Sequence, residues 1–164
     1  MIDEPGKYAV SIGAAGDFGA TLKVAPGETE SGVAIVEHTL APGTLGAPLH
    51  RHSGEDEISY VLEGELTAKQ GEEVTTAGPG EYVVKPRGVW HTFWNAGDEP
   101  LRFTETIAPG AFASYFEELA ALMPEGEPPD EEAMGQVGAL AGEYGLEMDP
   151  SSVPELLDAH GLRL

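Results

Sequence analysis

The chain has 164 residues, enough for one domain with a sizeable core, and its hydrophobic fraction of 41% is ordinary for a folded protein. Its net charge of −21 argues against a nucleic-acid-binding surface and against binding to anionic membranes. The absence of cysteine excludes disulfides, thiolate metal sites and cysteine nucleophiles, so a metal site would have to use His, Asp or Glu.

The start of the chain, MIDEPGKYAV, has no charged segment followed by an apolar run, so no secretory signal is expected. No apolar stretch approaches the roughly 20 residues that a membrane-spanning helix requires. We therefore expect a cytoplasmic protein whose acidic surface favours solubility.

The first two thirds of the chain are predicted to form short strands joined by tight turns. The chain has 22 glycines and 13 prolines, and glycine stands at nearly every corner between the alternating segments, which is typical of an antiparallel sandwich or barrel. The expected strands are Tyr8–Ile12, Ala20–Ala25, Val33–Leu40, Ala47–His52, Glu57–Leu62, Glu65–Lys69, Glu73–Thr76, Tyr82–Lys85, Trp90–Trp94 and Leu101–Ile107.

The pattern changes to a helical period at Pro109. Three helices are expected: Phe112–Met123, a second that follows the cap Asp130 and stops at Gly145, and a third that extends to about Ala159 and begins with a capping box of Ser152 and Glu155.

Residues 109–164 contain twelve acidic residues and one basic residue, Arg163. This segment is either an acidic partner-binding tail or lid, or a set of helices whose apolar faces cover the barrel. We expect the second arrangement, because an apolar helix face needs a surface to cover. The predicted organisation is thus a β-barrel over 1–108 and a helical extension over 109–164.

Three histidines and a glutamate have a spacing that favours a metal site. His50 and His52 are two residues apart on a strand and so share a face, although such a pair alone is commonly just exposed. Glu57 begins the next strand and reaches the same place if the two strands pair. His91 lies on a later strand that could neighbour either. Three imidazoles and a carboxylate suit a divalent first-row metal, either tetrahedral zinc or a six-coordinate ion with two open positions.

Strand parity predicts which side chains surround this site. The cavity walls are expected from residues on the same faces as the ligands, and the alternate residues are expected to pack against a helix or a second subunit. The first group is Ser59, Val61, Phe93 and Asn95, and the second is Trp90, Thr92 and Trp94.

Other polar residues near the site have competing interpretations. Glu55 or Asp56 could replace Glu57 as a ligand, but the spacing favours Glu57. His38 is expected to be a surface or outer-sphere histidine rather than a fifth ligand. If its side chain points outward, Glu37 points inward and could line the cavity.

Three further residues are expected at the surface. His160, in the last helix, is expected to be solvated. Lys85 and Arg87 flank a Pro-Gly turn, where they would either attract an anionic substrate or, as we expect, form part of a charged rim.

Two stretches, 43–64 and 80–95, resemble the two motifs of the cupin superfamily. In the first motif His50, His52, Glu57 and Gly64 have the family spacing, but the leading glycine departs from it, because Gly43 is too early and Gly46 too late. The second motif matches throughout, at Gly80, Pro86, Gly88, His91 and Asn95.

The resemblance implies a jelly-roll (double-stranded β-helix) barrel with the C-terminal helices packed outside. It also implies one divalent metal ion, such as Fe, Mn, Ni, Co or Zn, held by His50, His52, Glu57 and His91. The run EDEISYVLEGEL is most similar to bacterial single-domain cupins related to quercetin dioxygenases. Such a protein is expected to be a homodimer.

The same resemblance implies a metal-dependent dioxygenase acting on a small oxygenated aromatic substrate, in which Glu57 accepts a proton from a substrate hydroxyl. The alternatives are an isomerase or hydrolase that uses the same site without O₂, and a non-catalytic protein that binds or senses a small molecule.

Overall fold

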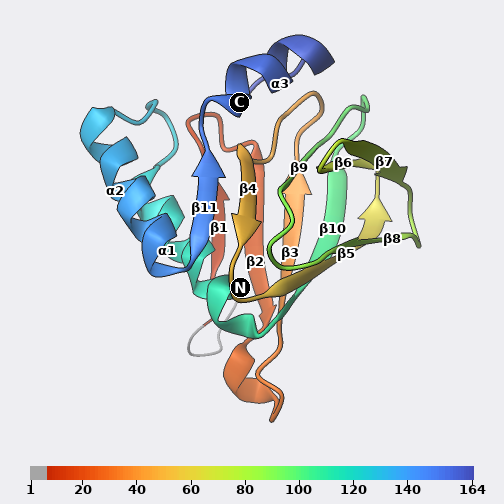
Figure 1. Ribbon diagram of the computed structural model, residues 1–164, viewed down its shortest axis with the longest axis vertical. Helices are drawn as coiled ribbons and strands as arrows, with labels where there is room; N and C mark the ends of the chain where they lie inside the picture. The colour runs from red at the N-terminus through yellow and green to blue at the C-terminus, as the bar shows by residue number, and fades with distance from the viewer. Residues whose placement is uncertain (1–6) are drawn as a thin grey trace.

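The computed structural model describes residues 7–164, and the six residues before them, part of the mixed segment 1–17, lie outside the described range. The described chain forms two antiparallel sheets that face each other, with helices outside them (Figure 1). This architecture confirms the predicted all-β jelly-roll barrel with C-terminal helices.

The larger sheet has six strands, in the order β1-β2-β3-β10-β5-β8. A short 3₁₀ turn, Pro26–Glu28, connects β2 to β3. The strands are β1 (Ala9–Ile12), β2 (Phe18–Val24), β3 (Ala34–Leu40), β5 (Asp56–Glu63), β8 (Tyr82–Lys85) and β10 (Leu101–Ala108).

The smaller sheet has five strands, in the order β11-β4-β9-β6-β7. Its strands are β4 (Leu49–His52), β6 (Leu66–Gln70), β7 (Glu73–Ala77), β9 (His91–Trp94) and β11 (Leu146–Asp149). All ten strands predicted before Pro109 are therefore confirmed, with ends that differ by a few residues at most.

The alternation of side chains explains how the barrel forms and why it holds a polar site. In β10, Leu101, Phe103, Glu105 and Ile107 are buried, while the residues that alternate with them are partly exposed. Apolar side chains from both sheets form one core, which removes their surface from water and stabilises the fold. Polar side chains such as Glu57 and Glu105 occupy inward positions of the same strands, so they are buried without interrupting the pattern.

The turn between β5 and β6 requires glycine. Gly64 has a φ of +80°, a conformation that other residues rarely adopt. A Cβ atom at this position would lie 2.6 Å from the carbonyl oxygen of Pro100. The close approach of this turn to the start of β10 therefore depends on the missing side chain.

The C-terminal helices pack on the barrel, as predicted for the acidic segment. They are α1 (Ser114–Leu122), which follows a 3₁₀ turn over Gly110–Ala113, α2 (Glu131–Glu143) and α3 (Ser152–His160). Tyr115 and Phe116 of α1 are buried, and the Oδ1 atom of Asp130 caps α2 by accepting a 2.8 Å hydrogen bond from the Ala133 amide. Within residues 7–164, no helix combines the length and apolar character needed to cross a bilayer.

Two details of the C-terminal segment differ from the prediction. The strand β11 was not expected, and it pairs with β4 along its whole length, beside α1 and α2 (Figure 1). The predicted capping box is wrong, because the Ser152 hydroxyl accepts from the Leu49 amide and donates to the Asp149 carbonyl instead. Ser152 thus joins the start of α3 to β4. The division into 1–108 and 109–164 stays a prediction.

Candidate metal centre

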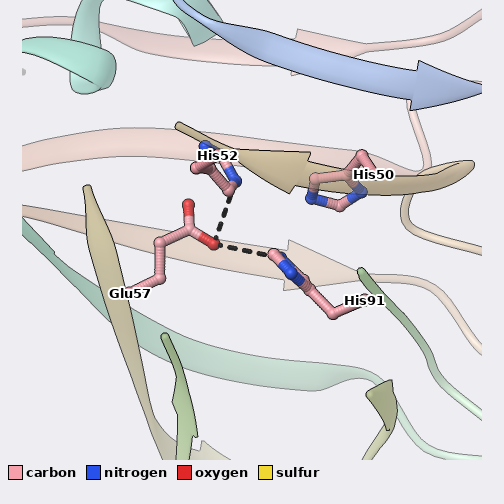
Figure 2. A group of neighbouring side chains, drawn as sticks. All are labelled: His50, His52, Glu57 and His91. Carbon is pink, nitrogen blue, oxygen red and sulfur yellow. Dashed lines mark ion pairs between the residues drawn. The ribbon is translucent and has the colours of Figure 1, made fainter. Parts of the chain in front are cut away.

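The four residues singled out by spacing meet inside the barrel. His50 and His52 lie on β4, His91 on β9 and Glu57 on β5, and one potential ligand atom from each lies within 4.8 Å of the others (Figure 2). All four side chains are buried. Strands β4 and β9 are neighbours, with His50 directly opposite His91.

Glu57 reaches the cluster differently from the way we expected. Its strand does not pair with β4, because β5 belongs to the six-stranded sheet while β4 belongs to the other. The carboxylate therefore approaches the histidines from the facing sheet (Figure 2). Its Oε2 atom lies 3.4 Å from Nε2 of His52 and 3.4 Å from Nε2 of His91.

Each imidazole is oriented by a partner at its outer nitrogen. The Nδ1 atom of His50 donates to the carbonyl of Pro48 at 2.7 Å, and that of His91 donates to the carbonyl of Val89 at 3.0 Å. The Nδ1 atom of His52 donates to the carboxylate of Glu55 at 2.7 Å. Such bonds fix the ring orientation and leave Nε2 available as a ligand, an arrangement typical of metal-binding histidines.

The two alternative ligands have other positions. Glu55 is buried but contacts the outer side of the His52 ring rather than the cluster itself. Asp56 pairs with Arg87 at the surface. The preference for Glu57 over these two neighbours agrees with the geometry.

The protonation states of the cluster are set by burial and by opposite charges. Burial raises the pKa of Glu57, but the Lys85 ammonium and the contacts with His52 and His91 outweigh it and hold the pKa well below its ordinary value. Burial, together with the neighbouring imidazoles of His91 and His52, holds the pKa of His50 well below its ordinary value.

His52 differs from His50 because it lies between two carboxylates. Burial lowers its pKa, but the contacts with Glu55 and Glu57 dominate and raise the pKa to about 9. In the absence of metal, a proton on this ring balances part of the negative charge. Metal binding requires the neutral imidazole and would release this proton.

The chemistry of the donor set fits a divalent transition metal. The Nε2 atoms of His52 and His91 are buried and have no hydrogen-bond partner among residues 7–164. Buried polar atoms are rarely left in this state. Three imidazoles and one carboxylate would satisfy such an ion, and the arrangement is consistent with one metal ion without selecting its identity.

The surroundings agree with strand parity. Ser59, Val61 and Phe93 are buried on the inner faces of their strands, and their role as cavity walls stays a prediction. Sequence reasoning missed Phe112, whose ring lies edge-on to His52 with the centroids 4.5 Å apart. Asn95 is also buried, but its amide donates to the carbonyls of Leu40 and Glu99, so it closes a loop.

Of the residues expected to pack against a helix or a second subunit, Trp94 contacts a helix, whereas Thr92 and Trp90 contact residues of the barrel. Trp94 stacks on His160 of α3 with the ring centroids 4.4 Å apart, while His160 itself stays exposed. Thr92 is buried and donates to the carbonyl of Ala47, and Trp90 lies under the guanidinium of Arg51.

Lys85 is not a rim residue, so that prediction was wrong. Its side chain is 3% exposed and its Nζ atom lies 2.7 Å from Oε1 of Glu105. Glu105 is equally buried, and this partner was also missed. Strand parity predicts the burial of both residues. Lys85 shares a strand face with the buried Val83, and Glu105 shares a face with Phe103 and Ile107.

His38 is not a fifth ligand, as expected, but the surface position that was one of its two alternatives is wrong. His38 is buried rather than at the surface, and its ring packs against Phe18 and Phe116 in the core. Glu37 therefore points outward, where it pairs with Arg102. Neither residue belongs to the cluster of ligand atoms.

The comparisons with known proteins agree with the fold and the motif residues. Residues 36–107 match the family profile described as "Cupin domain". This matched stretch is less than half of the chain, and it includes all four residues of the candidate metal centre.

Plant germin-like proteins are similar in sequence to about half of the chain. The chain is 33% identical over 82 residues to Germin-like protein 1 of Brassica napus, covering 47% of this chain and 39% of that protein. It is 37% identical over 90 residues to Germin-like protein subfamily 2 member 2 of Arabidopsis thaliana, covering 50% and 39%. The alignment thus spans well under half the length of these curated relatives, and neither is named a quercetin dioxygenase.

Solved structures share the fold of the chain. A sugar phosphate isomerase from Silicibacter pomeroyi has a TM-score of 0.54 and 21% identity, covering 66% of this chain and 74% of that one. The Cnp3 cupin domain of Schizosaccharomyces pombe has a TM-score of 0.51 and 14% identity, covering 63% and 72%. At these identities the similarity concerns architecture alone.

Proposed function

We propose that this chain is a metal-dependent dioxygenase acting on a small oxygenated aromatic compound. The observation that carries the proposal is the buried convergence of Nε2 atoms from His50, His52 and His91 with the carboxylate of Glu57. Four protein ligands leave two positions of a six-coordinate ion for a ligand that chelates through two oxygens.

The walls of the site support an aromatic substrate. Phe112 lies beside His52, and Phe93 lies on the same strand face as His91. Aromatic side chains with a few convergent polar groups are typical of sites for small ring compounds. Flavonols and related enediols combine a planar ring with adjacent oxygens and would fit such a site.

In this proposal Glu57 has two roles. It is a metal ligand, and its depressed pKa keeps it ionised, so it is able to accept the proton of a substrate hydroxyl. A bound redox-active ion would polarise the oxygens of the substrate and support its reaction with O₂. Phe93 and Phe112 would limit the access of water.

Metal loading followed by oxygen uptake tests the proposal. We expect one ion per chain after incubation with Fe, Mn, Ni, Co or Zn, and O₂ consumption with a flavonol for at least one redox-active metal. Glu57→Gln should reduce uptake at least about 100-fold, as loss of a positioned base does. Asp56→Asn, a neighbouring surface carboxylate, should leave uptake unchanged.

The outcomes separate the possible functions. A chain that binds metal but takes up no O₂ with any redox-active metal is not a dioxygenase, and a chain that binds no metal contradicts the metal centre itself. Metal-dependent ligand binding without turnover would indicate a sensing or binding protein.

A metal-dependent isomerase or hydrolase is the second candidate. It is favoured by the buried Glu105, whose pKa is raised to about 7 by burial despite the adjacent Lys85 ammonium. A carboxyl group with such a pKa exchanges protons readily near neutral pH. Product formation under anaerobic conditions would distinguish this chemistry from a dioxygenase.

The predicted homodimer and cytoplasmic location remain part of this proposal. The apolar side chains of Tyr82 and Val84 are exposed on the edge strand β8, which supports an interface there.

A further inference from the structure

Lys85 brings a buried positive charge to the metal centre from the edge strand β8. It lies directly opposite Glu57 in the pairing of β8 with β5. Its Nζ atom is 3.6 Å from Oε2 of Glu57. That oxygen is the same one that faces His52 and His91, so one atom of Glu57 has contacts on two sides.

Glu105 holds the ammonium of Lys85 in place. Its Oε1 atom lies 2.7 Å from Nζ of Lys85, while its Oε2 atom accepts a 2.6 Å hydrogen bond from the hydroxyl of Ser59. Ser59 is two residues after Glu57 on β5 and lies opposite Glu105 in the pairing with β10. The three side chains therefore form one network across β8, β5 and β10.

The stability of the fold does not explain this network. Burying an ammonium and a carboxylate costs several kcal/mol of desolvation, and replacing a buried ion pair by apolar residues of similar volume is often neutral or stabilising. Both side chains are almost fully buried, and Glu57 is the polar group that the ammonium faces besides Glu105. An effect of the Lys85 ammonium on Glu57 would explain why the chain keeps this pair despite its desolvation cost.

We propose that Lys85, anchored by Glu105, is a positioning residue that holds Oε2 of Glu57 toward the histidines, so that Glu57 offers a metal ion one oxygen rather than two. This inference rests on the proposed metal centre. A carboxylate without this restraint is free to rotate about its terminal torsion, which is broad. Removing Lys85 should therefore change the coordination of the metal and its affinity together.

The test uses Co²⁺, whose visible spectrum reports its coordination. Because Lys85→Met alone would leave Glu105 buried without its counter-ion, the main variant is Lys85→Met with Glu105→Gln. Its Co²⁺ spectrum should shift from that of the wild type toward that of Glu57→Gln, and its affinity should fall at least about tenfold, as for other residues that orient a ligand. The matched control, Lys23→Met with Glu37→Gln, removes an ion pair outside the barrel, together with the contact of Glu37 to Arg102, and should keep the wild-type spectrum.

A milder variant covers the case in which the double variant does not fold. Ser59→Ala removes only the hydrogen bond that anchors Glu105, and it should give a smaller spectral shift in the same direction. Wild-type Co²⁺ binding with an unchanged spectrum and affinity in the folded variants overturns the role of Lys85 alone. Failure of the wild type to bind Co²⁺ overturns the metal centre and, with it, this inference.

Discussion

At the scale of single residues, the metal centre depends on side chains that never touch the expected ion. Glu55 is the clearest example, because its carboxylate holds Nδ1 of His52 and thereby directs Nε2 into the cluster. Outer partners of this kind usually contribute one to two orders of magnitude to metal affinity. The neighbouring Asp56 has the same charge but contacts Arg87 at the surface.

We predict that Glu55→Ala weakens metal binding about 10- to 100-fold while the fold is kept, because the His52 ring loses the group that orients it. Competition of the protein with a chelator of known affinity would measure the change. Asp56→Ala is the matched control and should bind metal within about twofold of the wild type. Equal losses in both variants would mean that overall negative charge, rather than the contact with His52, controls affinity.

A second prediction concerns His38 and pH. Burial among aromatic rings lowers the pKa of His38 from 6.5 to about 4, although its Nδ1 atom donates to the carbonyl of Gly19. The unfolded chain therefore takes up a proton at this residue at higher pH than the folded chain does. Stability due to this residue is complete above pH 6.5 and is lost as the pH falls from 6.5 toward 4, by up to about 3 kcal/mol.

Replacing His38 by Phe should remove this part of the acid sensitivity. The free energy of unfolding, measured with urea at pH 8 and at pH 5, should fall less between the two values in His38→Phe than in the wild type. The difference in the free energy of unfolding between variant and wild type at pH 8 measures the effect of the missing hydrogen bond to Gly19 and of any change in packing. An equal decrease in both proteins would show that the pKa of His38 is the same in the folded and unfolded states.

At the scale of elements, the turn between β5 and β6 sets how the two sheets are connected. We predict that Gly64→Ala destabilises the protein by more than the roughly 1–2 kcal/mol of a residue forced into the left-handed region, because the new Cβ also meets the backbone of Pro100. Gly71→Ala is the control, since Gly71 also has a positive φ, of +58°, but its Cβ would meet open space. Similar midpoints of thermal unfolding for the two variants would contradict the steric part of this argument.

The same elements show how far the sequence predicts the molecule. Strands and ligands were predictable because alternation and motif spacing are local properties: the face of Glu57 follows from its neighbours on β5. The partner of each strand is not local, and Glu57 proved to face β4 from the other sheet. Likewise, β11 lacks a distinctive pattern, since it is a short strand defined by its pairing with β4.

Charged residues inside the barrel were missed for a different reason. Lys85 and Glu105 lie on inward faces by parity, but the ordinary preference of charged side chains for water suggested a surface position for Lys85. Each is tolerated inside because the other is present. A single strand cannot reveal such a partner, because the two residues are 20 positions apart on strands that meet only through β5.

At the scale of the whole molecule, the excess of 21 negative charges opposes compaction, because the folded state brings these charges closer together than the unfolded state does. The acidic helices α1 and α2 lie on the same side of the barrel, which concentrates part of this charge (Figure 1). Surface repulsion of this kind is screened when the Debye length falls from about 30 Å at 0.01 M salt to about 8 Å at 0.15 M.

We therefore predict that the midpoint of thermal unfolding rises when NaCl is increased from about 0.01 M to 0.15 M, since screening weakens a net repulsion. The triple variant Glu30→Gln, Glu72→Gln and Glu127→Gln provides the comparison, because these exposed residues have no ion-pair partner among those described. It removes three of the excess charges and should unfold at a higher temperature in low salt, with a smaller rise on adding salt. A midpoint that falls with salt would show instead that surface ion pairs such as Arg51–Glu147 outweigh the repulsion.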